Sequence, residues 1–166
     1  MFCQTENRKG FVMKKFIVSV MLFAFVMAMA SLAGAATVKG FGVTAVDGDT
    51  LHATIDKVKT KVKVNGIDAP EKGQPFYKEA YEALNELIKN KNLEIEVIEK
   101  KDGTTYAKIT VDGKNVAEEM VKKGMAWYYK REAPKEVKLE SMMENARKDG
   151  RGLWIPPTPP WEYRSK

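Results

Sequence analysis

The stretch from Thr37 to Val64 is the clearest indication of fold in this chain of 166 residues. Its apolar residues come in short runs rich in valine, isoleucine and threonine, which is typical of strands and not of helices. We therefore expect three strands in this stretch. Asp47-Gly48 separates two of the runs, Val43–Val46 and Thr50–Ile55. The pair is predicted to form a tight turn in which Gly48 takes a positive φ.

Two further strands are expected later in the chain. Leu93–Val97 alternates strictly between apolar and charged residues, which indicates a half-buried strand. Thr105–Val111 is its expected antiparallel partner, across a turn at Lys100–Gly103.

Three helices are expected between and after these strands. The first begins near Pro75 and carries an apolar stripe at helical spacing, formed by Tyr77, Ala80, Tyr81, Leu84 and Ile88. The second is capped by Asn115 and ends at Gly124, and the third runs from near Pro134 to Gly150. Strands come first, helices come late and no βαβ repeat is present. The order predicts an α+β fold, a five-stranded barrel with about three accessory helices.

The N-terminal region resembles an export signal. The segment Met13–Lys15 contains two lysines and is followed by an apolar run that ends in small residues at Ala33–Ala35. This is the order of segments in a secretory signal peptide. An uncleaved membrane anchor is the alternative, and residues 1–12 are compatible with a misassigned start of translation. We expect a leader at 1–35, one domain at 36–155, and export to the periplasm or the medium. The single cysteine, Cys3, lies in the leader, so the mature chain is expected to form no disulfide.

The last residues, 156–166, form a proline-rich tail. Its prolines are expected to exclude a helix or a central strand, which leaves a strap or an exposed end. A proline-rich ligand for a partner domain is an alternative.

Three carboxylates dominate the candidate chemistry. Asp49 follows the Asp-Gly turn, and Asp68 and Glu71 flank Pro70. If the two turns meet, Asp49 and Asp68 form an oxygen-rich site of the kind that Ca²⁺ prefers, with Glu71 beside it as a candidate general base.

The same residues carry a family resemblance. Asp47-Gly48-Asp49-Thr50, followed by a basic residue five positions before Asp68-Ala69-Pro70-Glu71, resembles the ordered pattern of the thermonuclease (staphylococcal-nuclease-like) family, over about Thr37 to Ile155. The resemblance implies an OB-type barrel with three helices and calcium-dependent hydrolysis of phosphodiester bonds. It also implies that Asp49, Asp68 and the main-chain carbonyl of Ala69 bind the metal. Glu71 would be the base, and Asp47 would support the site from behind.

The sequence departs from the family at two phosphate-binding arginines. Lys63 stands at the first position and keeps the charge without the planar fork. Thr104 stands at the second, where a hydroxyl cannot replace a guanidinium. Loss of one such donor costs about 10²- to 10³-fold in rate, so we expect reduced activity unless a lysine such as Lys100, Lys101 or Lys108 reaches the site.

Aromatic and basic residues mix at Trp127–Arg131, a composition suited to stacking single-stranded bases without sequence preference. Trp127 is equally compatible with the core, so Tyr129 and Lys130, with Lys101, are the predicted substrate contacts. The expected substrate is single-stranded DNA or RNA and the expected state is a monomer.

Two other functions remain open at this point. One is a non-catalytic OB-fold module that binds single-stranded nucleic acid or another polyanion, favoured by Thr104. The other is a structural envelope protein that binds a partner through its proline-rich tail.

Overall fold

The computed structural model describes residues 37–154 and 158–165. The predicted leader, residues 1–35, lies outside the described residues, as do 155–157 in the tail. The described elements are, in chain order, β1 (Thr37–Ala45), β2 (Thr50–Ile55), β3 (Val58–Val64), β4 (Ile67–Asp68), α2 (Tyr77–Ile88), β5 (Leu93–Lys101), β6 (Thr104–Val111), β7 (Lys114–Asn115), α3 (Val116–Lys122), β8 (Trp127–Tyr128), α4 (Val137–Lys148) and α5 (Pro160–Tyr163).

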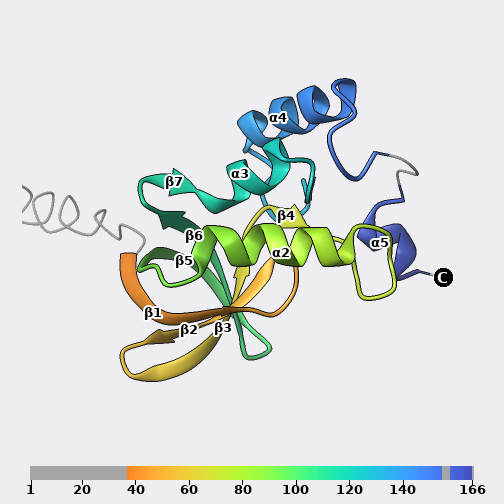
Figure 1. Cartoon of the computed structure of the whole chain (residues 1–166). Helices are drawn as coiled ribbons and strands as arrows, with labels where there is room; N and C mark the ends of the chain where they lie inside the picture. The colour runs from red at the N-terminus through yellow and green to blue at the C-terminus, as the bar shows by residue number, and fades with distance from the viewer. Residues whose placement is uncertain (1–36, 155–157, 166) are drawn as a thin grey trace, which may run out of the picture. The chain divides into compact units, whose positions relative to one another are not determined.

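Five strands close into a barrel. The sheet order is β3-β2-β1-β5-β6-β7, and an additional pairing between β3 and β6 joins its two sides. That pairing is parallel and places Lys63 beside Tyr106, whereas the other pairings in the barrel are antiparallel. The strands curve under the helices in Figure 1. The structure confirms the predicted α+β fold with a five-stranded OB-type barrel.

Short turns connect the antiparallel strands. Positive φ angles occur at both central residues of three turns, at Asp56-Lys57, Asp102-Gly103 and Asp112-Gly113. This is the backbone of type I′ turns, whose twist matches that of the flanking strands. The strands expected at Thr37–Val64, Leu93–Val97 and Thr105–Val111 are all present.

The turn at Gly48 differs from the prediction. Gly48 is not among the residues with a positive φ. A Cβ at this position would instead lie 2.7 Å from the Cβ atoms of both Ala69 and Ala80. Glycine is needed here because helix α2 and the loop after β4 both pass against the backbone, a steric reason that the local sequence does not contain.

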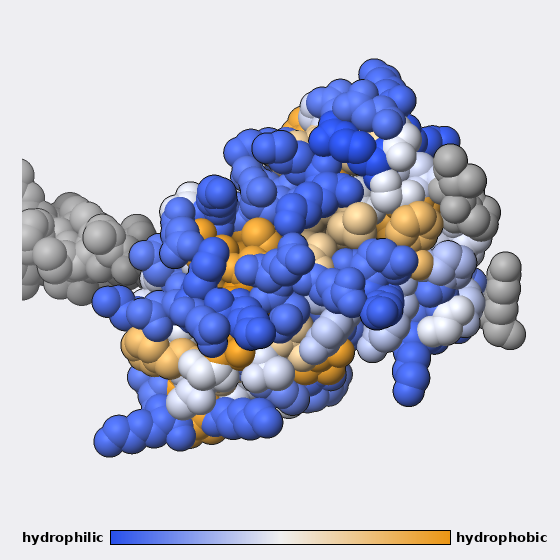
Figure 2. All heavy atoms as spheres, in the orientation of Figure 1, coloured by the Kyte–Doolittle hydropathy of each residue, from blue (hydrophilic) through white to orange (hydrophobic). Residues whose placement is uncertain are grey.

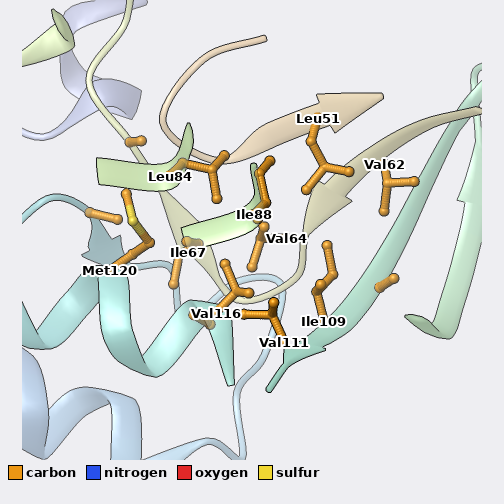
Figure 3. Close-up of a cluster of buried hydrophobic side chains, with 14 of the residues drawn as sticks. Leu51, Val62, Val64, Ile67, Leu84, Ile88, Ile109, Val111, Val116 and Met120 are labelled. Carbon is orange, nitrogen blue, oxygen red and sulfur yellow. The ribbon is translucent and has the colours of Figure 1, made fainter. Parts of the chain in front are cut away.

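The core lies between the barrel and two helices. Figure 3 shows strand residues such as Leu51 and Val64 facing Leu84 of α2 and Met120 of α3. The largest fully buried side chains are those of Leu51, Ile67, Leu84, Ile88, Leu93, Ile95, Ile109, Met120, Leu153, Val62, Val64 and Val116. Of the apolar stripe predicted for the first helix, Ala80, Leu84 and Ile88 are buried and Tyr81 packs against the core, as expected for an amphipathic helix. Tyr77 is not part of this cluster, and Ala83 takes its place among the buried residues.

The three predicted helices correspond to α2, α3 and α4. Asn115 caps α3 as expected, because its side chain accepts a hydrogen bond from the Glu118 N–H at 3.2 Å. No helix among the described residues is both long and apolar enough to cross a lipid bilayer.

The prediction that prolines exclude a helix from the tail is wrong. Helix α5 occupies Pro160–Tyr163, with proline in the first helical turn. Proline is tolerated there because the first N–H groups of a helix have no intrahelical acceptor, and its fixed φ already suits the helix. In the view of Figure 1, α5 lies beyond the N-terminal end of α2.

The surface seen in Figure 2 is mainly hydrophilic, with hydrophobic residues showing in separate areas among the polar ones. Glu79, Glu82 and Lys122 are among the polar residues that line the shallow hollow between α2 and α3. No large apolar patch is visible on this face.

Candidate active site

The loop between β1 and β2 is shaped by Asp47. Its Oδ1 accepts hydrogen bonds from the N–H groups of Asp49 at 3.0 Å and Thr50 at 2.7 Å. This arrangement turns the Asp49 side chain inward, where the residue is only 5% exposed. Burial, reinforced by the charge of Asp49, raises the pKa of Asp47 to about 6.

Asp49 is fully engaged by its neighbours. Its Oδ2 accepts from Lys63 Nζ at 2.7 Å and from the Ala69 N–H at 2.8 Å, and its Oδ1 accepts from Thr50 Oγ1 at 2.8 Å. Burial alone would raise the pKa of Asp49, but the charge and hydrogen bond of Lys63 outweigh it, so the pKa is lowered. In the same pair, burial would lower the pKa of Lys63, and the charge of Asp49 raises it above its usual value.

Asp68 lies next to Asp49. It belongs to β4, which pairs with β8 so that Asp68 faces Trp127 in register, and it is 2% exposed. Lys63 Nζ is 3.9 Å from Asp68 Oδ1, so one lysine contacts both carboxylates. Burial raises the pKa of Asp68 despite the neighbouring cations. The two turns predicted to meet therefore do meet, through Lys63.

Arg164 also enters the site, and sequence reasoning missed it. It donates to Asp68 through both guanidinium nitrogens, from Nη2 to Oδ2 at 2.7 Å and from Nη1 to Oδ1 at 3.2 Å. Nη1 also donates to Glu71 Oε1. The hydrogen bonds to Asp68, opposed by partial burial and aided by those to Glu71, raise the pKa of Arg164. An isolated arginine in a proline-rich tail carries no sequence pattern that would predict this contact.

Arg164 is held by the C-terminal arm, which we define as residues 158–165. Gln74 connects the arm to the loop after β4: its Nε2 donates to the Thr158 carbonyl at 2.8 Å, and its Oε1 accepts from the Glu71 N–H at 2.9 Å. Trp161 stacks on Tyr129 with ring centroids 5.3 Å apart. The arm is therefore attached at two points, to Gln74 in the loop that carries Glu71 and to Tyr129 after β8.

Two of the predicted substrate contacts share a surface groove of about 290 Å³. Lys101 and Tyr129 line it together with Asn65, Ile98, Glu99, Tyr106, Arg131 and Glu132. The groove adjoins the site, because Tyr106 is the strand partner of Lys63. Tyr106 and Arg131 are thus substrate-contact candidates that periodicity did not single out.

The other basic candidates lie elsewhere. Lys130 is exposed and pairs with Glu140 of α4 at 3.6 Å, and Lys108 pairs with Glu136 at 2.6 Å. Thr104 begins β6 between Lys61 and Lys101. The structure therefore does not bring Lys130 or Lys108 to the carboxylates.

Glu132 is a further acidic residue close to the site. Its Oε2 accepts from the Gly66 N–H at 3.3 Å. Burial raises the pKa of Glu132, and the charge of Lys63 opposes that effect.

The residues present fit a hard cation. Carboxylate and carbonyl oxygens are the ligands that Ca²⁺ prefers, and Asp49 and Asp68 offer two buried carboxylates. In this structure their oxygens are paired with Lys63 and Arg164, so a metal ion would have to displace these cationic groups. Within the ranges that the structure describes, no group of three or more histidine, cysteine, aspartate or glutamate side chains forms a metal cage. A metal would therefore depend on Asp49, Asp68 and the predicted carbonyl of Ala69, with the remaining ligands from water or substrate.

Sequence comparison relates the chain to proteins named as nucleases. A probable staphylococcal-like nuclease CAN1 of Oryza sativa subsp. japonica is 40% identical over 111 residues, which cover 64% of this chain and 33% of the relative. An uncharacterized endonuclease of Escherichia coli O157:H7 is 30% identical over 138 residues, covering 79% of this chain and 88% of the relative. A micrococcal nuclease of Shigella flexneri is 31% identical over 156 residues, covering 85% and 88%.

The chain spans about a third of the length of the plant relatives, at 33%, 32% and 33%. The family described as "Staphylococcal nuclease homologue" matches residues 61–156, more than half of the chain. That match includes Lys63, Asp68 and Glu71, three of the residues on which the resemblance was based. The chain therefore belongs to the staphylococcal nuclease family, which confirms the family predicted from its sequence.

Proposed function

We propose that this protein is an exported, calcium-dependent nuclease that hydrolyses phosphodiester bonds in DNA and RNA with little sequence specificity. The observation that carries the proposal is the adjacency of buried Asp49 and Asp68, with Glu71 held beside Asp68. Family membership and relatives named endonuclease and micrococcal nuclease support it.

Each residue of the site has a role in this chemistry. A calcium ion held by Asp49, Asp68 and the Ala69 carbonyl would polarise the phosphate and help to orient a water molecule. Glu71 is the general base that takes the proton from that water. Its side chain is 41% exposed, so water reaches it. Lys63 keeps Asp49 ionised and places a positive charge beside the phosphate.

The groove next to Lys63 suits a single strand. Lys101 and Arg131 supply positive charge for the backbone, and Tyr106 supplies an aromatic ring for an unpaired base. Tyr129 lines the same groove, with one face of its ring stacked on Trp161. Stacking on such rings is worth about 1–3 kcal/mol per base and depends little on base identity. We therefore favour heat-denatured DNA or single-stranded RNA as substrate, bound by a monomer.

The test is a cleavage assay on the purified chain with heat-denatured DNA, in calcium and in EDTA. Glu71→Gln is expected to abolish calcium-dependent cleavage, because an amide accepts the same hydrogen bond but cannot take up a proton. The matched control is Glu82→Gln on α2, where the carboxylate is exposed and pairs with Lys78 at 3.7 Å.

Cleavage that survives both EDTA and Glu71→Gln would refute the proposal. Salt-sensitive binding of single-stranded DNA without any cleavage would support the non-catalytic OB-fold module instead, the function favoured by Thr104.

A further inference from the structure

Arg164 lies at the centre of the carboxylate cluster although it is 93 residues away from Glu71 in the chain. Its guanidinium forms a forked contact with Asp68 and also reaches Glu71. The side chain is 44% exposed. An arriving ligand can therefore contact the guanidinium without unfolding the arm.

A cation at this position offsets part of the negative charge of the site. Asp49, Asp68 and Glu71 carry negative charge, and Lys63 is already paired with Asp49 at 2.7 Å. A phosphodiester brings a further negative charge, and more charge develops on its oxygens during hydrolysis. Among the ion pairs of residues 37–154 and 158–165, Arg164 is the cation that contacts both Asp68 and Glu71.

The arm presents Arg164 in a defined place. Thr158 is bound by Gln74, Trp161 stacks on Tyr129, and α5 connects these anchors to Arg164. The Tyr163 hydroxyl also lies 3.1 Å from where a Cβ on Gly73 would be. A short helix fixed at several points loses less entropy on binding a ligand than a free tail would.

We propose that Arg164 is a substrate-binding residue that holds the scissile phosphate, an inference that rests on the proposed nuclease function. A guanidinium binds a phosphate through the same parallel pair of N–H bonds that it makes with Asp68. Asp68 cannot give the same oxygens to Arg164 and to a metal ion. A metal-loaded site therefore leaves Arg164 with donors free for the phosphate, while the arm keeps it within reach.

The test compares Arg164→Ala and Arg164→Lys with wild type, using Arg147→Ala as the matched control. Arg147 is an exposed arginine in the last turn of α4. The first readout is the affinity of a short, single-stranded phosphorothioate oligonucleotide in calcium over a range of salt concentrations. Losing one phosphate contact should lower the slope of log K against log salt by about 0.7. Arg164→Ala should show this loss, Arg164→Lys should keep most of the slope, and Arg147→Ala should match wild type.

The second readout is cleavage of heat-denatured DNA, which should fall by about 10²- to 10³-fold in Arg164→Ala. Calcium titration should show tighter metal binding in the same variant, because a competing cation has been removed from Asp68. An unchanged salt slope would overturn the inference, and so would faster cleavage by Arg164→Ala, which would identify the arm as a plug that blocks the site.

The two proposals fail in different ways. A wild-type protein that never cleaves refutes the nuclease, whereas the salt slope still tests Arg164 as a phosphate contact. If Arg164→Ala has a lower melting temperature than wild type, Arg164→Lys provides a comparison at equal folded fraction. That variant keeps a positive charge next to Asp68. If Arg164→Lys cleaves and binds as poorly as Arg164→Ala, the phosphate contact requires the forked guanidinium and not only a positive charge.

Discussion

Replacing Lys63 with methionine tests whether one lysine compensates the buried carboxylates. Lys63 is 17% exposed at its side chain and lies 2.7 Å from Asp49. Methionine keeps the apolar stem and removes the charge, leaving Asp49 buried without its cationic partner. Breaking a buried pair in this way costs about 3–5 kcal/mol. We expect the free energy of unfolding in EDTA at pH 7 to fall by about that amount, measured by urea denaturation.

The matched control is Lys91→Met. Lys91 and Asp112 form an ion pair of similar length, 2.8 Å, but their side chains are 38% and 63% exposed. Solvent screens such a pair, so its loss should cost about 0–1 kcal/mol. A double-mutant cycle with Asp49→Asn separates charge from packing, because removing both charges should recover most of the loss caused by Lys63→Met.

The effect should depend on pH in a defined direction. The pKa of Asp49 is lowered in the folded protein. An unfolded aspartate has a pKa of about 4, so the pairing of Asp49 stabilises the fold fully above that pH. This stabilisation is lost as the pH falls below it toward the lower pKa of the folded state. The difference between wild type and Lys63→Met should therefore shrink as the pH is lowered from 7 toward 3. A loss below about 1 kcal/mol at pH 7, or one that is equal at both pH values, would refute the reasoning.

Two further substitutions test local features of the fold. Gly48→Ala places a Cβ 2.7 Å from the Cβ atoms of Ala69 and Ala80. Overpacking of this kind should lower the free energy of unfolding in urea by about 1–3 kcal/mol. Unchanged stability would show that the loop can move to accommodate the methyl group. Asn115→Ala removes the cap bond to the Glu118 N–H and should cost about 0.5–2 kcal/mol by thermal denaturation, whereas Asn115→Asp should keep most of that stability.

The barrel could be predicted because its signals are local. Short β-branched runs and the alternation at Leu93–Val97 specify strands wherever they lie in the fold. The pairs Asp102-Gly103 and Asp112-Gly113 specify tight turns, whereas Asp47-Gly48 does not form the predicted one. A shared site for Asp49 and Asp68 was implied by the family resemblance of the two turn segments, and the structure brings the two residues together through Lys63.

The features that were missed depend on contacts between distant residues. Gly48 is constrained by Ala80 of α2, and its own neighbours in sequence do not reveal that approach. Arg164 reaches Asp68 only because Trp161 and Gln74 anchor the arm. A side-chain contact of this kind leaves no periodicity in the chain, and the prolines suggested an irregular end where a short helix forms.

The parallel pairing of β3 with β6 has a consequence for how the protein folds. It joins Lys61–Val64 to Thr104–Ala107, segments separated by the whole of α2 and β5. Closing so long a loop costs chain entropy that is recovered only when the contacts form, and such non-local contacts slow folding. Lys63 belongs to one of the two paired strands, so the proposed substrate-binding surface is completed only when the barrel closes. A nascent chain that ends before β6 has emerged cannot form this surface. Binding at this site therefore indicates that the barrel has closed.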